Sequence, residues 1–313
     1  MISMINKDYL YTNIWDDISS VVLESKALYL YAHDPEDRSR YCISKLLTKN
    51  SDTIFEEISI NENDQMVLSS NNRIVPLSST EAINKFFSTY NFDVLYLEVT
   101  GMSCRLIAPI MKFAIDKGFK INIVYSEPKE YLIEKFQTEG LNKDLSESVG
   151  GVSPLPGFIR LVPFKEEPIF VIFLGFEGGR FSYLVTNKQP SFDKILPIVG
   201  VPGYRMHYPF ETYWGNRNAL QTTKAYERVV YAEANSIVDS YMTLKRISYD
   251  KRDPNMIVAP IGTKPHVIGA ILYAIKNPQK VELLYDNPKR NLHRTKGVGR
   301  ILVCDVTKLF KEN

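Results

Sequence analysis

A strand, turn, helix, strand pattern occurs twice in this chain and restricts its fold more than any other feature. The later copy is Met256–Arg290, MIVAPIGTKPHVIGAILYAIKNPQKVELLYDNPKR, and the earlier one is Val94–Lys129, VLYLEVTGMSCRLIAPIMKFAIDKGFKINIVYSEPK. Each begins with a short apolar run, which is typical of a strand buried on both faces. Each continues with apolar residues three and four positions apart, which is typical of a helix. The pattern predicts mainly parallel sheets with helices between their strands.

A second pair of matching segments precedes the first pair. Leu28–Ser39 and Phe170–Phe181 each contain an apolar strand, then a glutamate, then an arginine two or three residues later where a helix begins. Two correspondences in the same order favour an internal duplication, although the βαβ units of any α/β protein resemble one another. We therefore predict an α/β fold of two Rossmann-like lobes, residues 1–141 and 168–313, joined by a glycine- and proline-rich linker at 142–167.

Chain length and composition agree with two soluble domains. The 313 residues suffice for two domains with separate cores, and the hydrophobic fraction of 44% is normal for a globular protein. A formal net charge of +2 argues against bulk binding of DNA, so any anion site must be local. The cysteines Cys42, Cys104 and Cys304 have neither disulfide nor zinc spacing. With no membrane span and no signal peptide recognised, a cytoplasmic location is expected.

Several further elements are predicted from periodicity alone. Helices are expected around Trp15–Leu23, after Glu127–Tyr131 and ending near Gly140, and over Ala219–Ile247, the longest helical stretch. Short strands at Thr53–Ile60 and Gln65–Leu68 form either a hairpin or a loop. A final strand is expected at Ile301–Val306, after a basic stretch that contains Arg294 and Arg300.

The turns of the two matching copies combine small and polar residues at a helix start. Gly262 lets backbone approach a ligand, Thr263 offers a hydroxyl and Lys264 a positive charge. Donors at a helix N-terminus favour anions, so the turn predicts a phosphate-binding corner. The earlier copy offers Thr100, Gly101 and Ser103 at the same place, although capping alone would explain its hydroxyls.

The segments after the first strands add charged candidates. Arg38 lies near a helix N-terminus, where a cation opposes the helix dipole, so it binds an anion or pairs with Glu36. Glu177 and Arg180 occupy the matching place in the second half. Replacing Arg38 or Lys264 with alanine is expected to weaken ligand binding and to leave the melting temperature nearly unchanged.

The turns Val99–Ser103 and Ile261–Pro265 resemble the ligand loop of CRISPR-associated Rossmann fold (CARF) sensor domains. The resemblance is confined to short motifs in both halves, which differ from each other at Met102–Arg105 and Thr263–His266. It implies a sensor or adaptor in prokaryotic antiviral defence that binds an anionic, cyclic oligonucleotide between two lobes and acts on a separate effector protein. The implied ligand-binding residues are Arg38, Ser39, Thr100, Gly101, Ser103, Glu177, Arg180, Gly262, Thr263, Lys264 and His266. Neither a metal nor a cofactor is expected.

Two other functions stay open at this stage. A metal-independent phosphodiesterase could position the nucleotide with Lys264 and nearby hydroxyls, although no nucleophile elbow, zinc cluster or Walker sequence occurs. Its candidate acids and bases are His33, His207, His266, His293, Glu127 and Glu177. A structural subunit of a defence complex would instead use the long helix, through Tyr226, Val230 and Ile237, as its contact. No residue pattern identifies catalytic groups, so an enzyme is the less favoured reading.

Overall fold

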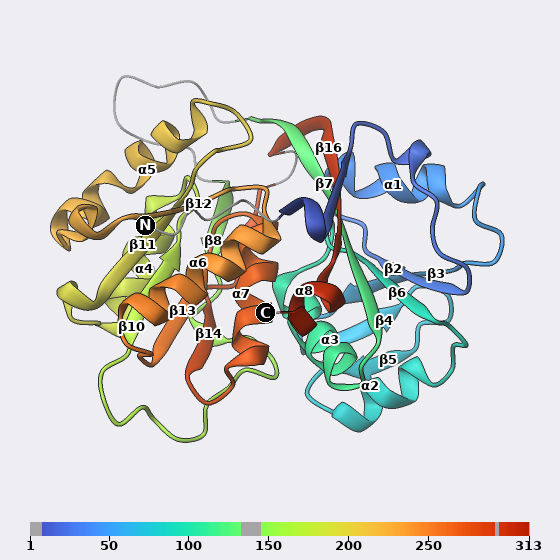
Figure 1. Ribbon diagram of the computed structural model, residues 1–313, viewed down its shortest axis with the longest axis horizontal. Helices are drawn as coiled ribbons and strands as arrows, with labels where there is room; N and C mark the ends of the chain where they lie inside the picture. Colours follow the sequence, from blue (N-terminus) through green and yellow to red (C-terminus); the bar gives the residue numbers. More distant parts are fainter. Residues whose placement is uncertain (1–7, 133–144, 292–293, 313) are drawn as a thin grey trace. The chain divides into compact units, whose positions relative to one another are not determined.

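Parallel strands form the centre of both large sheets in the computed structural model, which describes residues 8–132, 145–291 and 294–312 (Figure 1). The chain divides into two units, Met1–Leu132 with Leu292–Asn313, and Ile133–Asn291. The fold class predicted from the sequence, two Rossmann-like α/β lobes with mainly parallel sheets, is confirmed. None of the described helices is long and apolar enough to cross a lipid bilayer.

The first unit contains an eight-stranded sheet in the order β1-β16-β7-β6-β2-β3-β4-β5. The parallel strands are β2 (Ala27–Tyr31), β3 (Ile54–Ile60), β6 (Val94–Glu98) and β7 (Lys120–Tyr131). The antiparallel strands are β1 (Thr12–Trp15), β4 (Gln65–Leu68), β5 (Ile74–Pro76) and β16 (Thr295–Asp305). The helices are α1 (Arg38–Leu46), α2 (Thr80–Phe87), α3 (Cys104–Asp116) and α8 (Val306–Glu312), with 3-10 turns at Asp8–Leu10 and Ile18–Ser20.

The second unit contains a six-stranded sheet in the order β12-β11-β10-β13-β14-β9. The parallel strands are β10 (Ile169–Phe173), β11 (Ile195–Gly200), β12 (Val230–Ala232), β13 (Met256–Pro260) and β14 (Val281–Tyr285). The edge strand β9 (Ser153–Pro154) is antiparallel, and β8 (Ser146–Val149) pairs with β15 (Pro288–Arg290). The helices are α4 (Gly178–Lys188), α5 (Tyr208–Thr222), α6 (Ile237–Asp250) and α7 (Lys264–Lys276), with 3-10 turns at Phe192–Lys194 and Ala225–Arg228.

Alternate residues of the central strand β10 pack against helices on opposite faces of the sheet. Phe170 and Ile172 belong to a core cluster with Phe181 of α4 and Leu220 of α5. Phe173 faces the other way, where its ring lies 4.9 Å from that of His266 in α7. Because both faces are covered, every residue of β10 is buried and the strand reads as a continuous apolar run.

The two units share the order of four parallel strands. The order is β3-β2-β6-β7 in the first unit and β11-β10-β13-β14 in the second. The first strand, β2 or β10, thus lies between the next strand in the chain, β3 or β11, and the later strand β6 or β13. The segments that match in sequence, around β2 and β10 and around β6–β7 and β13–β14, occupy matching places in these orders. The shared topology agrees with a duplication, and the duplication itself stays a prediction.

The division into units differs from the predicted boundaries at the C-terminus. Residues 292–313, which the sequence assigned to the second lobe, belong to the first unit. The reason is strand pairing, because β16 lies between β7 and β1 and is antiparallel to both. Figure 1 shows β16, in red, beside β7, in green.

Two predicted helices differ from the structure, and a third lies outside the described residues. Thr12–Trp15 is the strand β1, followed by a 3-10 turn, where a helix at Trp15–Leu23 was predicted. Glu127–Tyr131 continues β7, and the helix predicted to follow it and to end near Gly140 lies outside the described residues. The long helix predicted at Ala219–Ile247 is also wrong, because α5 ends at Thr222 and strand β12 precedes α6.

The break in the predicted long helix also separates its proposed contact residues. Tyr226 lies in a 3-10 turn, Val230 in β12, and Ile237 is fully buried at the start of α6. These residues do not share one exposed helical face. The predicted strands at Thr53–Ile60, Gln65–Leu68 and Ile301–Val306 correspond to β3, β4 and the end of β16, and β3 and β4 pair as a hairpin.

Candidate functional site

Each sheet has a topological switch point, between β2 and β6 in the first unit and between β10 and β13 in the second. In the first unit β2 pairs with β3 on one side and with β6 on the other. In the second unit β10 lies in the same way between β11 and β13. Connections leave such neighbouring strands in opposite directions, and ligands of open α/β sheets bind there, outside the carboxyl ends of the strands. The predicted site residues follow these strands in both units.

The turn glycines let the loop after β6 approach the end of β2, and the loop after β13 approach the end of β10. A Cβ atom added to Gly101 would lie 1.9 Å from the carbonyl oxygen of Ala32, the residue after β2. A Cβ atom on Gly262 would lie 3.0 Å from the carbonyl oxygen of Leu174, the residue after β10. Both glycines therefore serve close packing of backbone against backbone at the switch point.

The hydroxyls of the first unit's loops bind backbone groups. Thr100 Oγ1 accepts a 3.0 Å hydrogen bond from the Ser126 amide. Ser103 is the N-cap of α3, and its hydroxyl accepts from the Arg105 amide at 3.1 Å. Ser39 Oγ donates to the carbonyl oxygens of Asp34 and Glu36, both at 2.8 Å. These hydroxyls hold the switch-point loops in place, and their role in ligand binding stays a prediction.

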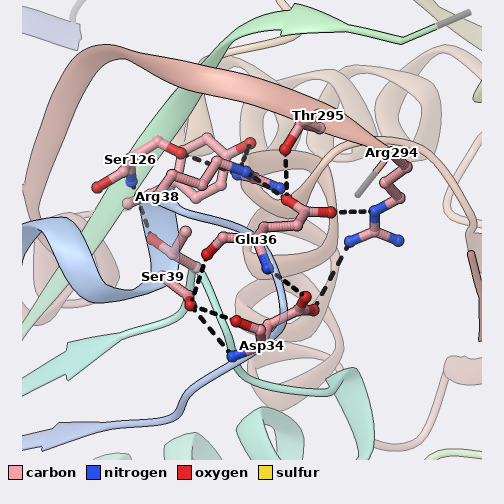
Figure 2. A network of polar contacts seen from close by, with 9 residues as sticks. Asp34, Glu36, Arg38, Ser39, Ser126, Arg294 and Thr295 are labelled. Atoms are coloured by element: carbon pink, nitrogen blue, oxygen red, sulfur yellow. Dashed lines mark hydrogen bonds and ion pairs between the residues drawn. The ribbon is translucent and has the colours of Figure 1, made fainter. Parts of the chain in front are cut away.

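Glu36 is the centre of the buried polar network shown in Figure 2. Arg38 Nε donates to Glu36 Oε2 at 2.6 Å, the Thr295 hydroxyl donates to the same oxygen at 2.7 Å, and Arg294 Nε donates to Oε1. Burial opposes ionisation of Glu36, but the two guanidinium groups outweigh burial and lower its pKa to about 2. Glu36 is thus a fully partnered carboxylate inside the protein.

Arg38 is the buried partner of this carboxylate. Besides Glu36, its Nη1 donates to the Ser126 carbonyl at 2.9 Å and to the Tyr125 hydroxyl at 3.3 Å, and its guanidinium carbon lies 5.7 Å from the Tyr125 ring centre. Of the two alternatives for Arg38, pairing with Glu36 is confirmed. A direct contact between Arg38 and a ligand stays a prediction.

Arg180 occupies the matching place in the second unit but has a different main partner. Its Nε and Nη2 each donate to Asp286 at 2.6 Å, and its Nη1 donates to the Ile261 carbonyl at 3.1 Å. The guanidinium carbon lies 5.8 Å from the Tyr285 ring centre. The contact from Nη1 to Glu177 Oε2 is long, at 3.4 Å. The bidentate pair with Asp286 therefore fixes Arg180.

The start of α7 is buried and carries a neutral histidine. Thr263 caps the helix by accepting from the His266 amide and also donates to the Ala234 carbonyl at 2.6 Å. Lys264 begins the helix and is buried. His266 Nε2 lies 3.1 Å from the Glu233 carbonyl oxygen, so Nε2 carries the proton and Nδ1 is an acceptor. Burial lowers the pKa of His266 to about 4, so the imidazole is neutral at physiological pH.

The structure also brings polar residues to the switch points that the sequence did not single out as ligands. Glu98 ends β6, accepts from the Tyr29 hydroxyl at 3.1 Å, and has its pKa raised to about 8 by burial. An acidic residue inside the apolar run at Val94–Val99 was the signal available for it. Asp286 and Asn216 had no such signal, because their partners Arg180 and Gly175 are distant in the chain.

The other candidate acids and bases lie in different surroundings. Glu127 pairs with Arg300, whose Nε lies 3.0 Å from its carboxylate, and His33 lies 3.9 Å from a Glu57 oxygen. His207 precedes α5 and its ring contacts Tyr208 edge-on. His293 lies outside the described residues. Within the described part of the chain, no group of three or more His, Cys, Asp or Glu side chains could hold a metal ion.

Comparison with protein-family models and with curated proteins finds no match. Among solved structures, the chain is similar to a periplasmic ribose ABC transporter from Conexibacter woesei, with 11% sequence identity and a TM-score of 0.22. The similarity covers 81% of this chain and 69% of that chain. At this TM-score the similarity supports no conclusion about ligand or activity.

Proposed function

We propose that this protein binds an anionic nucleotide and acts as a sensor or adaptor for a separate effector protein. A cyclic oligonucleotide and a setting in prokaryotic antiviral defence follow from the CARF resemblance. The observation that carries the proposal is the position of the predicted loops, which follow the two strands flanking each topological switch point. That one ligand is shared by both lobes stays a prediction.

The electrostatics of the loop before α7 support a phosphate as one part of the ligand. The helix has thirteen residues and begins at Lys264, so the positive end of its dipole and a lysine lie at one strand end. A helix N-terminus favours negative charge, and a lysine beside it adds to this local potential. A net charge of +2 for the whole chain is compatible with such a local site.

Calorimetric titration with a panel of mononucleotides and cyclic oligonucleotides tests the proposal. The wild-type chain is expected to bind at least one of them. Lys264→Gln keeps a polar side chain, one atom shorter, and removes its charge, so it is expected to weaken binding about tenfold, or about 1.4 kcal/mol. Lys276→Gln, at the other end of α7, is the matched control and is expected to leave affinity unchanged.

Absence of binding across the panel would contradict the proposal, as would equal affinities of the wild type and Lys264→Gln with both variants folded. Mass spectrometry of the titrated samples distinguishes a sensor from a phosphodiesterase. Intact nucleotide is expected after prolonged incubation. Accumulation of a cleaved product would contradict a sensor function and would favour the phosphodiesterase.

A further inference from the structure

The two units each have a glutamate at a matching position, but the hydrogen-bond partners of its carboxylate differ between the units. Glu36 and Glu177 each lie between the first parallel strand and the first helix of their unit, and each contacts an arginine of that helix. Each of these arginines also lies within 6 Å of a tyrosine ring, Tyr125 of β7 or Tyr285 of β14. The surroundings of the two carboxylates can therefore be compared directly.

In the first unit, strand β16 completes the hydrogen bonds of the carboxylate. Arg294, just before β16, donates to Glu36 Oε1, and Thr295 donates to Oε2 together with Arg38. In the second unit the strand beyond β14 is β9, which consists of Ser153 and Pro154 and supplies no cation. The second unit thus has no counterpart of Arg294 among its described residues.

Glu177 is consequently left with an unused oxygen. Among the described residues, its Oε2 has only the 3.4 Å contact with Arg180, whose short bonds go to Asp286. Its Oε1 is buried and has no hydrogen-bond partner among the described residues. The residue is only 7% exposed. A buried carboxylate oxygen without a donor is costly, by about 1 to 3 kcal/mol or more. Such an oxygen calls for an explanation, and a donor from outside the chain, water or a ligand, supplies one.

Asn216 places a second unused acceptor beside the same turn. Its Nδ2 donates to the carbonyl oxygens of Gly175 and Thr212, at 2.7 and 2.8 Å, which fixes the orientation of the amide. Its Oδ1 is buried without a partner among the described residues. A Cβ atom on Gly178 would lie 3.0 Å from the Cα atom of Asn216, so this part of α5 abuts the start of α4, where Glu177 is the N-cap.

We propose that Glu177 and Asn216 form a subsite for hydrogen-bond donors of the ligand, the amino group of a nucleobase or the hydroxyls of its ribose. The carboxylate and the amide oxygen only accept hydrogen bonds, and a carboxylate repels phosphate, so the subsite binds the nucleoside part. The ligand donor takes the place that Arg294 and Thr295 take at Glu36. Extension of this subsite to a nucleotide rests on the proposed function.

Titration of the intact chain with adenosine and with AMP, against wild type and Glu177→Gln, tests the subsite. The glutamine keeps the shape of the side chain but loses its charge and one acceptor, so affinity for both compounds is expected to fall about tenfold or more. The melting temperature without ligand is expected to stay the same or rise, because the variant removes a poorly paired buried charge. Asp286→Asn is the structural contrast and is expected to lower the melting temperature, since it breaks the pair with Arg180.

Ligand analogues test the same subsite on the unchanged protein. Loss of affinity for 2′-deoxyadenosine identifies the ribose hydroxyl as the donor, and loss for purine riboside identifies the amino group. Equal affinity of wild type and Glu177→Gln for AMP, or no loss with either analogue, overturns the subsite and leaves the proposed function standing. Adenosine binding that depends on Glu177 but gains nothing from phosphate overturns the proposed function and supports the subsite. Binding of neither compound overturns the subsite as assigned.

Discussion

At the scale of single residues, the arginines predicted as ligand contacts have partners inside the protein. Arg38 is bonded to Glu36 and Arg180 to Asp286, and all four residues are buried. Removing one member of a buried ion pair leaves the other charge without compensation, which costs more than the pair itself contributes. We therefore no longer expect Arg38→Ala to leave the melting temperature unchanged, and we expect it to destabilise the protein.

Arg38→Ala is expected to lower the free energy of unfolding by about 3 kcal/mol, because Glu36 would lose one of its two guanidinium partners inside the protein. Urea denaturation followed by circular dichroism measures the change. Arg40→Ala on the exposed side of the same helix is the control and is expected to cost less than about 0.5 kcal/mol. Equal stability of the two variants would show that the Glu36 network is not a stabilising element.

At the scale of elements, the strand and helix that follow each turn glycine were predictable from periodicity. The reason for the glycine was not predictable from periodicity. In the first unit, the atom that Gly101 avoids is the carbonyl oxygen of Ala32, which follows β2 and lies about seventy residues earlier in the chain. The long predicted helix failed for a similar reason. Lys224 has a left-handed φ of 52°, and β12 pairs with β11. Neither feature can be recognised from the helical spacing of the apolar residues.

Gly101→Ala is expected to destabilise the first unit by about 3 kcal/mol, since the added methyl would overlap the Ala32 carbonyl and force β2 and the loop after β6 apart. Thermal unfolding of the variant measures the loss. Gly118→Asn separates crowding from backbone strain, because Gly118 has a φ of 73° but open space around it, and asparagine tolerates that conformation. A loss for Gly118→Asn as large as for Gly101→Ala would contradict the packing argument.

At the scale of the whole molecule, the C-terminal segment completes the first unit rather than the second. Strand β16 lies between β1 and β7, and its residues Ile301, Leu302 and Cys304 are fully buried. The predicted boundary failed because strand pairing joins residues that are far apart in the chain, and a one-dimensional pattern does not show which sheet a strand enters.

Deletion of residues 292–313 is expected to destabilise the first unit and to leave the second unit nearly unchanged. The chain has two tryptophans, Trp15 in β1 and Trp214 in α5, so each unit carries its own fluorescent probe. Single-tryptophan variants, Trp214→Phe and Trp15→Phe, allow urea unfolding of each unit to be followed separately. A shift of the Trp214 transition alone would restore the boundary predicted from the sequence.

The sequence by itself determined the fold class, the order of the main strands and helices, and the loops that lie at the switch points. Apolar periodicity and turn residues are local properties, and they suffice for these features. Only the tertiary structure decided which side chains meet. It paired Glu36 with Arg38 and Arg294, and Arg180 with Asp286, and it left Glu177 Oε1 without a hydrogen-bond partner among the described residues. Such pairings depend on strand order and burial, which bring distant residues into one low-dielectric environment and set the cost of any charge left alone there.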